Sequence, residues 1–161
     1  MNAIDLLKAQ HRKVEGLFSK IHKAKDAKKK EGLFVEIADS LAIHATIEEH
    51  HFYPGVKAKS TEGLLLESVE EHLAMKRVLS DLLDLDVQDE TFDAKLKVLQ
   101  DLVEHHVEEE EDDLFPKVAK SLDKDQLAEL AEAMESEQAE LEERGNPRDA
   151  VPAETERAAT I

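Results

Sequence analysis

The sequence predicts an all-α protein: an antiparallel up-down four-helix bundle with a short C-terminal fifth helix and a disordered tail. Four long segments carry apolar residues at alternating spacings of three and four, which is the pattern of a bundle seam. A cassette running from His44 to Pro54 recurs 62 residues later, from His106 to Pro116, and indicates two similar halves. The chain of 161 residues is long enough for one sizeable core.

The periodic segments predict helices over residues 2–27, 31–58, 62–84 and 90–119, with a bend near Pro54 in the second. A fifth helix is expected over 123–144, because Asp123 and Gln126 resemble a capping box and Gly145 follows the segment. The remaining stretch has two prolines and no periodicity, so it predicts a disordered tail. We therefore divide the chain into a metal-binding bundle (1–120), a C-terminal helix (121–145) and a flexible tail (146–161).

Composition and charge limit the binding partners and the cellular location that we expect. A formal net charge of −17 disfavours binding to phosphate backbones, so we expect no nucleic-acid partner. No segment is apolar over the length of a membrane span, and the chain start lacks a long apolar core, so we expect a cytoplasmic protein without membrane contact. Because the chain has no cysteine, any metal must be held by His, Glu and Asp.

Polar residues interrupt the middle of every apolar stripe. Each cassette places an imidazole and a carboxylate four residues apart, on one face of a helix. Counted from the turns, these positions and the two further histidines fall within about one or two helical turns of one height. The converging set is His11, His44, Glu48, His72, His106 and Glu110.

Burying four imidazoles and two carboxylates without partners would cost several kcal/mol, at roughly 1–3 kcal/mol for each desolvated group and more for a charge. A site for two metal ions removes that cost, since neutral imidazoles and anionic carboxylates are metal ligands. This donor set suits iron or manganese and would accept zinc.

The stripes also rank the neighbouring candidates. His106 and Glu110 continue the seam of the fourth helix, whereas His105 and Glu109 fall about 100° to one side. Glu48 is favoured over Glu49 for the same reason. Glu49 and Glu111 are candidates for hydrogen-bond acceptors behind the ligands. His51 is expected to cap the layer, with a metal role as the alternative, and Tyr53 and Phe115 are expected to pack at the bundle end.

The pattern His, His-x-x-x-Glu, His, His-x-x-x-Glu resembles the hemerythrin-like family of His/His/Glu cation-binding domains, over about residues 4 to 120. The resemblance implies an up-down bundle that holds two non-haem irons and reacts with dioxygen, nitric oxide or peroxide. The family's ligand positions map onto the six residues named above.

One position departs from the oxygen carriers of this family. They have a second histidine four residues after the third-helix ligand, where this chain has Lys76, a poor ligand while protonated. Its counterpart in the repeat is Glu15. We expect Glu15 and Lys76 beside the metals, either paired with each other or with Glu15 as an additional ligand. Fewer imidazoles would favour redox turnover over reversible oxygenation.

The function we expect is a non-haem di-iron protein that binds or reacts with a small gaseous or peroxide ligand, for sensing, detoxification or iron handling. Two alternatives stay open: a di-metal oxidase or catalase-like peroxidase, and a metal store or interaction module. A ferritin-like centre needs Glu-x-x-His on two helices, and only Glu48-x-x-His51 fits. No protein partner is indicated by the sequence.

Overall fold

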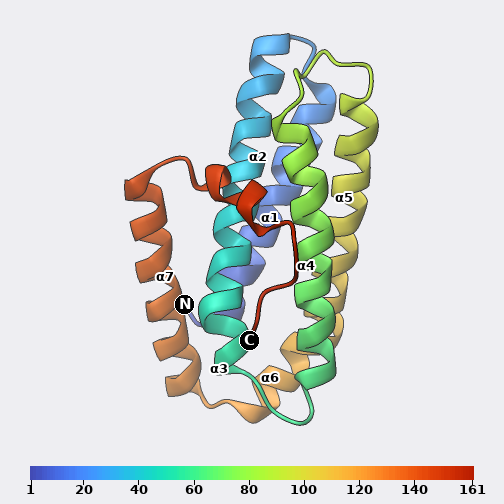
Figure 1. Ribbon diagram of the computed structural model, residues 1–161. Coiled ribbons are helices and arrows are strands. Elements are labelled where there is room, and N and C mark those ends of the chain that lie inside the picture. The colour runs from blue at the N-terminus through green and yellow to red at the C-terminus, as the bar shows by residue number, and fades with distance from the viewer.

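The computed structural model covers residues 1–161 and confirms the all-α prediction. The long helices are α1 (Ala3–Lys23), α2 (Ala27–Ile47), α4 (Glu62–Leu83) and α5 (Phe92–Glu109). They lie side by side and alternate in direction along the chain (Figure 1), and we call these four helices the bundle. No helix has the uninterrupted apolar length that crossing a bilayer requires.

The second and fourth predicted helices are each interrupted by a π-helical turn. These turns are η1 (Glu48–Phe52) and η2 (Glu110–Leu114), which lead into α3 (Tyr53–Gly55) and α6 (Phe115–Ser121). In each turn, the backbone N–H of the following aromatic residue bonds the carbonyl oxygen of the glutamate five residues earlier. A proline follows each aromatic residue and has no N–H to donate to the carbonyl four residues back. The repeat in the sequence is thus a repeat in backbone geometry.

Side-chain caps define where the helices begin. Asn2 accepts a hydrogen bond from the backbone of Asp5 at the start of α1, and Asp26 does the same for Lys29 at the start of α2. Helix α7 (Lys124–Arg144) begins with the predicted capping box of Asp123 and Gln126. It packs along the outside of the bundle against α1 and α2 (Figure 1).

The apolar core is divided into two parts of nearly equal size. One cluster of 18 buried residues, including Phe18, Ile37 and Phe92, fills the end near the α1–α2 turn. A second cluster of 17, including Leu7 and Ile47, fills the opposite end. Each fully buried large apolar side chain contributes about 1.5–3 kcal/mol. The two clusters enclose a polar layer at mid-height.

The predicted disordered tail is wrong, because residues after Gly145 fold back across the bundle (Figure 1). Residues Pro147–Glu154 form a 3₁₀ helix, η3, that packs against α2 and α4. Val151 is 3% exposed and belongs to the first apolar cluster. Arg148 makes two hydrogen bonds of 3.0 and 3.1 Å to the carboxylate of Asp39. Val151, the contacts of Ala158, Ala159 and Ile161 with the second apolar cluster, and specific ion pairs therefore order a segment whose composition predicts disorder.

Candidate metal centre

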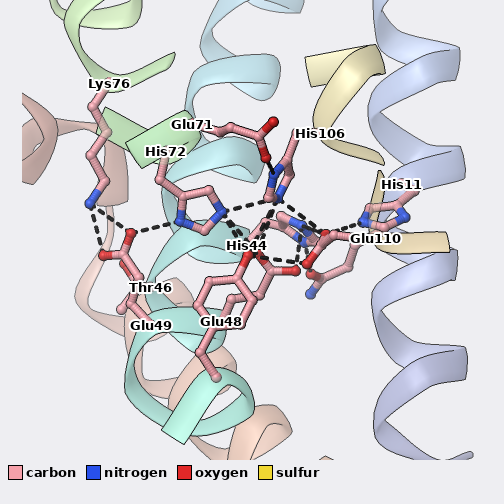
Figure 2. A network of polar contacts seen from close by, with 12 residues as sticks. His11, His44, Thr46, Glu48, Glu49, Glu71, His72, Lys76, His106 and Glu110 are labelled. Carbon is pink, nitrogen blue, oxygen red and sulfur yellow. Dashed lines mark hydrogen bonds and ion pairs between the residues drawn. The ribbon is translucent and has the colours of Figure 1, made fainter. Parts of the chain in front are cut away.

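The six side chains predicted to converge lie together in the polar layer, and all are buried (Figure 2). Each bundle helix or the π turn after it contributes: His11 from α1, His44 from α2, Glu48 from η1, His72 from α4, His106 from α5 and Glu110 from η2. The unchosen pair, His105 and Glu109, lies on the outer face, where the His105 side chain is 61% exposed. The apolar stripes therefore predicted correctly which of these neighbours face inward.

Four of the side chains form one compact group of donors. The facing atoms of His11, His44, Glu48 and Glu110 all lie within 4.8 Å of one another. His44 Nε2 is 3.1 Å from Glu48 Oε1, and His11 Nε2 is 3.3 Å from Glu110 Oε1. All four of these atoms are buried without a hydrogen-bond partner. Because buried polar atoms are seldom left unpaired, this pocket of lone pairs fits a cation.

Glu48, His72 and His106 form the second group. His72 Nε2 lies 2.9 Å from Glu48 Oε2 and 3.2 Å from His106 Nε2. The two oxygens of Glu48 therefore face different groups. Glu110 Oε1 is similarly placed between His11 Nε2 and His106 Nε2, at 3.3 and 3.2 Å. Glu48 therefore belongs to both groups, whereas Glu110 belongs to the first group and lies close to His106 of the second.

Every imidazole in the layer makes a hydrogen bond through its Nδ1 atom, on the side of the ring that faces away from the donor groups. The acceptors are Glu111 for His11, Gln10 for His44, Glu49 for His72 and Glu71 for His106, at 2.7–2.8 Å. A neutral imidazole that donates from Nδ1 keeps a free lone pair on Nε2, which here points inward. Glu49 and Glu111 were predicted for this position, whereas Gln10 and Glu71 were not. Their signal is that each precedes a ligand histidine by one residue.

Tyr53 was expected at the bundle end, but its hydroxyl lies in the layer. It is 2.9 Å from Glu48 Oε2 and 3.1 Å from Glu110 Oε2, so its single proton can be donated to either carboxylate. In a regular α-helix a residue five positions after Glu48 would be rotated by about 140° from it. The π turn reduces that rotation, and such turns are frequent at functional sites. Burial, together with the Glu110 and Glu48 carboxylates, holds the pKa of Tyr53 well above 10.

Phe115 is the counterpart of Tyr53 in the second cassette and also turns toward the layer. Its ring stacks on His11 with a centroid separation of 5.9 Å. It brings no hydroxyl. The sequence signal for both residues is the aromatic-Pro pair at equal distance from Glu48 and Glu110.

Lys76 lies beside the layer, and it pairs with other carboxylates than Glu15. Its Nζ atom is 2.8 and 3.0 Å from the two oxygens of Glu49 and 2.9 Å from Glu154 in η3. Burial by itself would lower the pKa of Lys76, but Glu49 and Glu154 outweigh it and raise the pKa. Lys76 therefore remains protonated and has no lone pair to offer a metal.

Two other expectations were wrong. Glu15 is exposed and pairs with Arg12 at 3.4 Å, because the buried stripe of α1 continues from His11 to Val14 and Phe18 and leaves Glu15 outside it. His51 lies outside both groups of donors. Its Nε2 atom is 2.7 Å from Glu137 on α7, because the π turn directs it to that helix.

The layer carries opposite charges at close range. Burial would raise the pKa of Glu48, yet the neighbouring histidines outweigh it and hold the pKa well below 4.5. Burial would lower the pKa of His106, yet Glu110 and Glu48 outweigh it and hold the pKa well above 6.5. In the metal-free protein the layer thus favours positive charge on His106 beside negative charge on Glu48, and a bound metal cation would supply the same positive charge.

Comparison with known proteins agrees with the geometry. Over 144 residues the chain is 29% identical to a protein of Nostoc sp. (strain PCC 7120 / SAG 25.82 / UTEX 2576) called a DNA nickase. That match covers 89% of this chain and 41% of the relative, so the chain spans about two-fifths of the relative's length.

A solved structure is also similar throughout. It is the crystal structure of a hemerythrin HHE cation binding domain-containing protein from Mycobacterium kansasii, with a TM-score of 0.80 and 26% sequence identity. The likeness covers 96% of this chain and 99% of that one. Residues 2–118 match the family described as the hemerythrin HHE cation binding domain. The chain therefore belongs to the hemerythrin HHE cation binding domain family.

Proposed function

We propose that this chain is a cytoplasmic non-haem di-iron protein that binds or reacts with dioxygen, nitric oxide or peroxide. The observation that carries the proposal is the set of four buried, unpartnered and mutually facing atoms on His11, His44, Glu48 and Glu110. A metal ion there would pair all four, and the second group offers three further donors.

Some residues of the layer would bind the metal ions, and others orient those ligands. His11, His44, Glu48 and Glu110 would hold one ion, and His72, His106 and the shared Glu48 would hold the other. When bound, a pair of irons would supply redox-active centres with coordination positions free for a small ligand.

The surrounding side chains orient and protect this centre. The Nδ1 hydrogen bonds fix the imidazole tautomers, so that no rearrangement is needed when Nε2 binds a metal. The Tyr53 hydroxyl holds a proton next to both carboxylates. The apolar clusters above and below keep the layer dry and strengthen its electrostatic interactions.

A second candidate, a catalase-like peroxidase, is favoured by the arrangement around Lys76. The ion pair with Glu49 keeps this lysine from ligating, so the second group has one donor fewer than the first. An iron with more open positions favours peroxide turnover over reversible oxygenation. Replacing Lys76 by His should shift the protein toward reversible dioxygen binding, and unchanged behaviour would contradict this explanation.

The name of the Nostoc relative adds no nucleic-acid function to the proposal. This chain spans 41% of that protein. Its formal net charge of −17 would repel a phosphate backbone. We therefore infer a small ligand rather than DNA as the partner of the centre.

The test is to load the metal-free protein with ferrous iron under anaerobic conditions, count the bound iron and record the visible spectrum before and after dioxygen is admitted. Two irons per chain with new charge-transfer bands are expected. Reversal of the bands under vacuum would indicate a carrier, and their irreversible decay would indicate turnover. A matched variant, Glu48→Ala with Glu110→Ala, should bind no iron pair. Retention of two irons by that variant would contradict the assigned ligands.

A further inference from the structure

A small cavity lies directly beside the polar layer, enclosed by the bundle and η3. It measures about 40 Å³ when counted as the space open to the centre of a water-sized sphere. Since one water needs on the order of 10–15 Å³ by that measure, the cavity has room for roughly three waters or one molecule of two heavy atoms. All four layer histidines line it, so a molecule inside would lie against the proposed metal ligands.

The remaining wall of this cavity is mainly apolar. Residues such as Val14, Met75, Leu79 and Val103 face it. The polar side chains at its edge already have partners: Gln10 bonds His44, and Lys76 bonds Glu49 and Glu154. Apart from the Nε2 atoms of His11 and His44, which we assign to the metal, the polar side chains that line the cavity have partners, so the space itself suits a small uncharged molecule.

The C-terminal segment supplies the outer wall. Pro147, Ala150, Val151 and Glu154 of η3 line the cavity, and Val151 is buried at 3% exposure. These residues lie beyond the stretch that matches the family, which ends at residue 118. The wall is thus formed by residues outside the stretch that matches the family.

Three contacts fasten this wall to the bundle. At one end Arg148 binds Asp39 of α2. At the other end Arg77 of α4 donates a hydrogen bond of 2.9 Å to the backbone carbonyl of Thr155. Between them Glu154 pairs with Lys76 at 2.9 Å. Lys76 also binds Glu49, which accepts the hydrogen bond of His72, so the wall is tied to the layer itself (Figure 2).

We propose that η3 is the specificity-determining wall of the ligand cavity, and that Val151 sets the size limit for molecules that reach the centre. The inference rests on the proposed function for the identity of the reacting ligand. It assigns the cavity to uncharged molecules of two heavy atoms, such as dioxygen, nitric oxide and hydrogen peroxide. Bulky organic hydroperoxides are excluded because the volume they need is occupied by Val151 and its neighbours.

The first test uses metal-free protein and xenon, a probe of apolar cavities. In the native chain, xenon should shift the methyl NMR resonances of Met75 and Val103. Val151→Ala should increase xenon binding and Val151→Phe should abolish it. Val98→Ala is the matched control, because Val98 is 50% exposed on α5. Identical xenon shifts in native protein and Val151→Ala would overturn the proposal, even if the phenylalanine variant fails to fold.

The second test uses iron-loaded protein and compares hydrogen peroxide with cumene hydroperoxide. Val151→Ala should raise the rate for cumene hydroperoxide relative to hydrogen peroxide by about tenfold, the usual effect of removing one or two methyl groups from a pocket. Bound iron should be unchanged. An unchanged rate ratio in protein that binds and uses iron would overturn the role of Val151 and leave the proposed function standing. Failure to bind iron would overturn the proposed function, while the xenon result would still decide the cavity wall.

Discussion

The first repeat of the bundle brings His11 and His44 to the polar layer, and the second repeat brings His72 and His106. The two groups of donors are nevertheless unequal, because both Glu48 and Glu110 face the first group and only Glu48 belongs to the second. The aromatic counterparts differ as well, since Tyr53 adds a hydroxyl where Phe115 adds none. A duplicated sequence has thus become a centre with one four-donor group and one more open group.

The largest expected effect separates the two carboxylates. Glu48→Ala removes a donor from both groups and should lower the affinity for both ions by more than about 100-fold. Even the loss of a residue that only hydrogen-bonds a ligand lowers metal affinity roughly 10–100-fold. Glu110→Ala should leave one ion at the second group. Counting bound metal after gel filtration measures both effects. Glu108→Ala, at an exposed position near the end of α5, is the control. Equal losses in the two variants would contradict the asymmetry.

Tyr53→Phe makes the two aromatic positions alike. Two irons should be retained, because the hydroxyl donates a hydrogen bond and is no part of either donor group. Reaction with hydrogen peroxide should slow on the order of 100-fold, the usual worth of a positioned proton donor. Stopped-flow absorbance measures the rate.

Phe115→Leu is the comparison for that variant. It removes an aromatic ring that stacks on His11 but changes no hydroxyl. It should lower the free energy of unfolding by about 1–2 kcal/mol and leave the rate near the parent value. A similar slowing in both variants would show that ring packing, not the hydroxyl, controls the reaction.

The acceptors behind the histidines provide a weaker contrast. Glu49→Gln and Glu111→Gln each remove the charge of one acceptor, the first behind His72 and the second behind His11. Each should reduce the affinity of its own group by about 10–100-fold. The loss should be greater for Glu49, whose side chain is 6% exposed against 23% for Glu111. Titration with a chelator of known affinity measures it, and equal losses would indicate that burial does not set the strength of these bonds.

The sequence predicted those parts of the molecule that follow helical periodicity. His44 with Glu48 and His106 with Glu110 are four apart on apolar stripes, and their inward placement follows from that spacing alone. Tyr53 was misplaced because the π turn changes the rotation per residue after Glu48. Glu15 was misplaced because the repeat was assumed to match Lys76, although the two positions differ in burial.

The C-terminal segment shows a different limit. Its composition lacks a periodic apolar pattern, and it is ordered by Val151 and a few other apolar contacts together with Arg148, Arg77 and the Lys76–Glu154 pair. Such long-range contacts leave no local pattern in a sequence. Gln10 and Glu71 were missed because each stands next to one ligand histidine in the sequence but bonds a different one, 34 and 35 residues away.

The smallest expected effect is on the pH dependence of the metal-free protein. Burial lowers the pKa of His72 and of His106, but the facing carboxylates outweigh it and raise both pKa values above 6.5. The stability they add is therefore complete below pH 6.5 and lost as the pH rises through the raised values. For Glu48 and Glu110, burial would raise the pKa, but the facing histidines outweigh it and lower the pKa. The stability that these two carboxylates add is therefore complete above pH 4.5 and lost as the pH falls.

The metal-free chain should consequently be most stable between about pH 4.5 and 6.5, with its melting temperature falling by about 2–4 °C for each kcal/mol lost above that range. Iron should remove the alkaline loss, because a bound cation takes over the charge that protons supply and binds better as they leave. Thermal unfolding followed by circular dichroism, with and without chelator, measures both curves. His72→Gln should flatten the alkaline limb of the metal-free curve, since it removes one of the two imidazoles whose raised pKa values produce that limb. An alkaline limb unchanged in that variant would place the protons in the first group instead, and would reverse which half of the centre is the more basic.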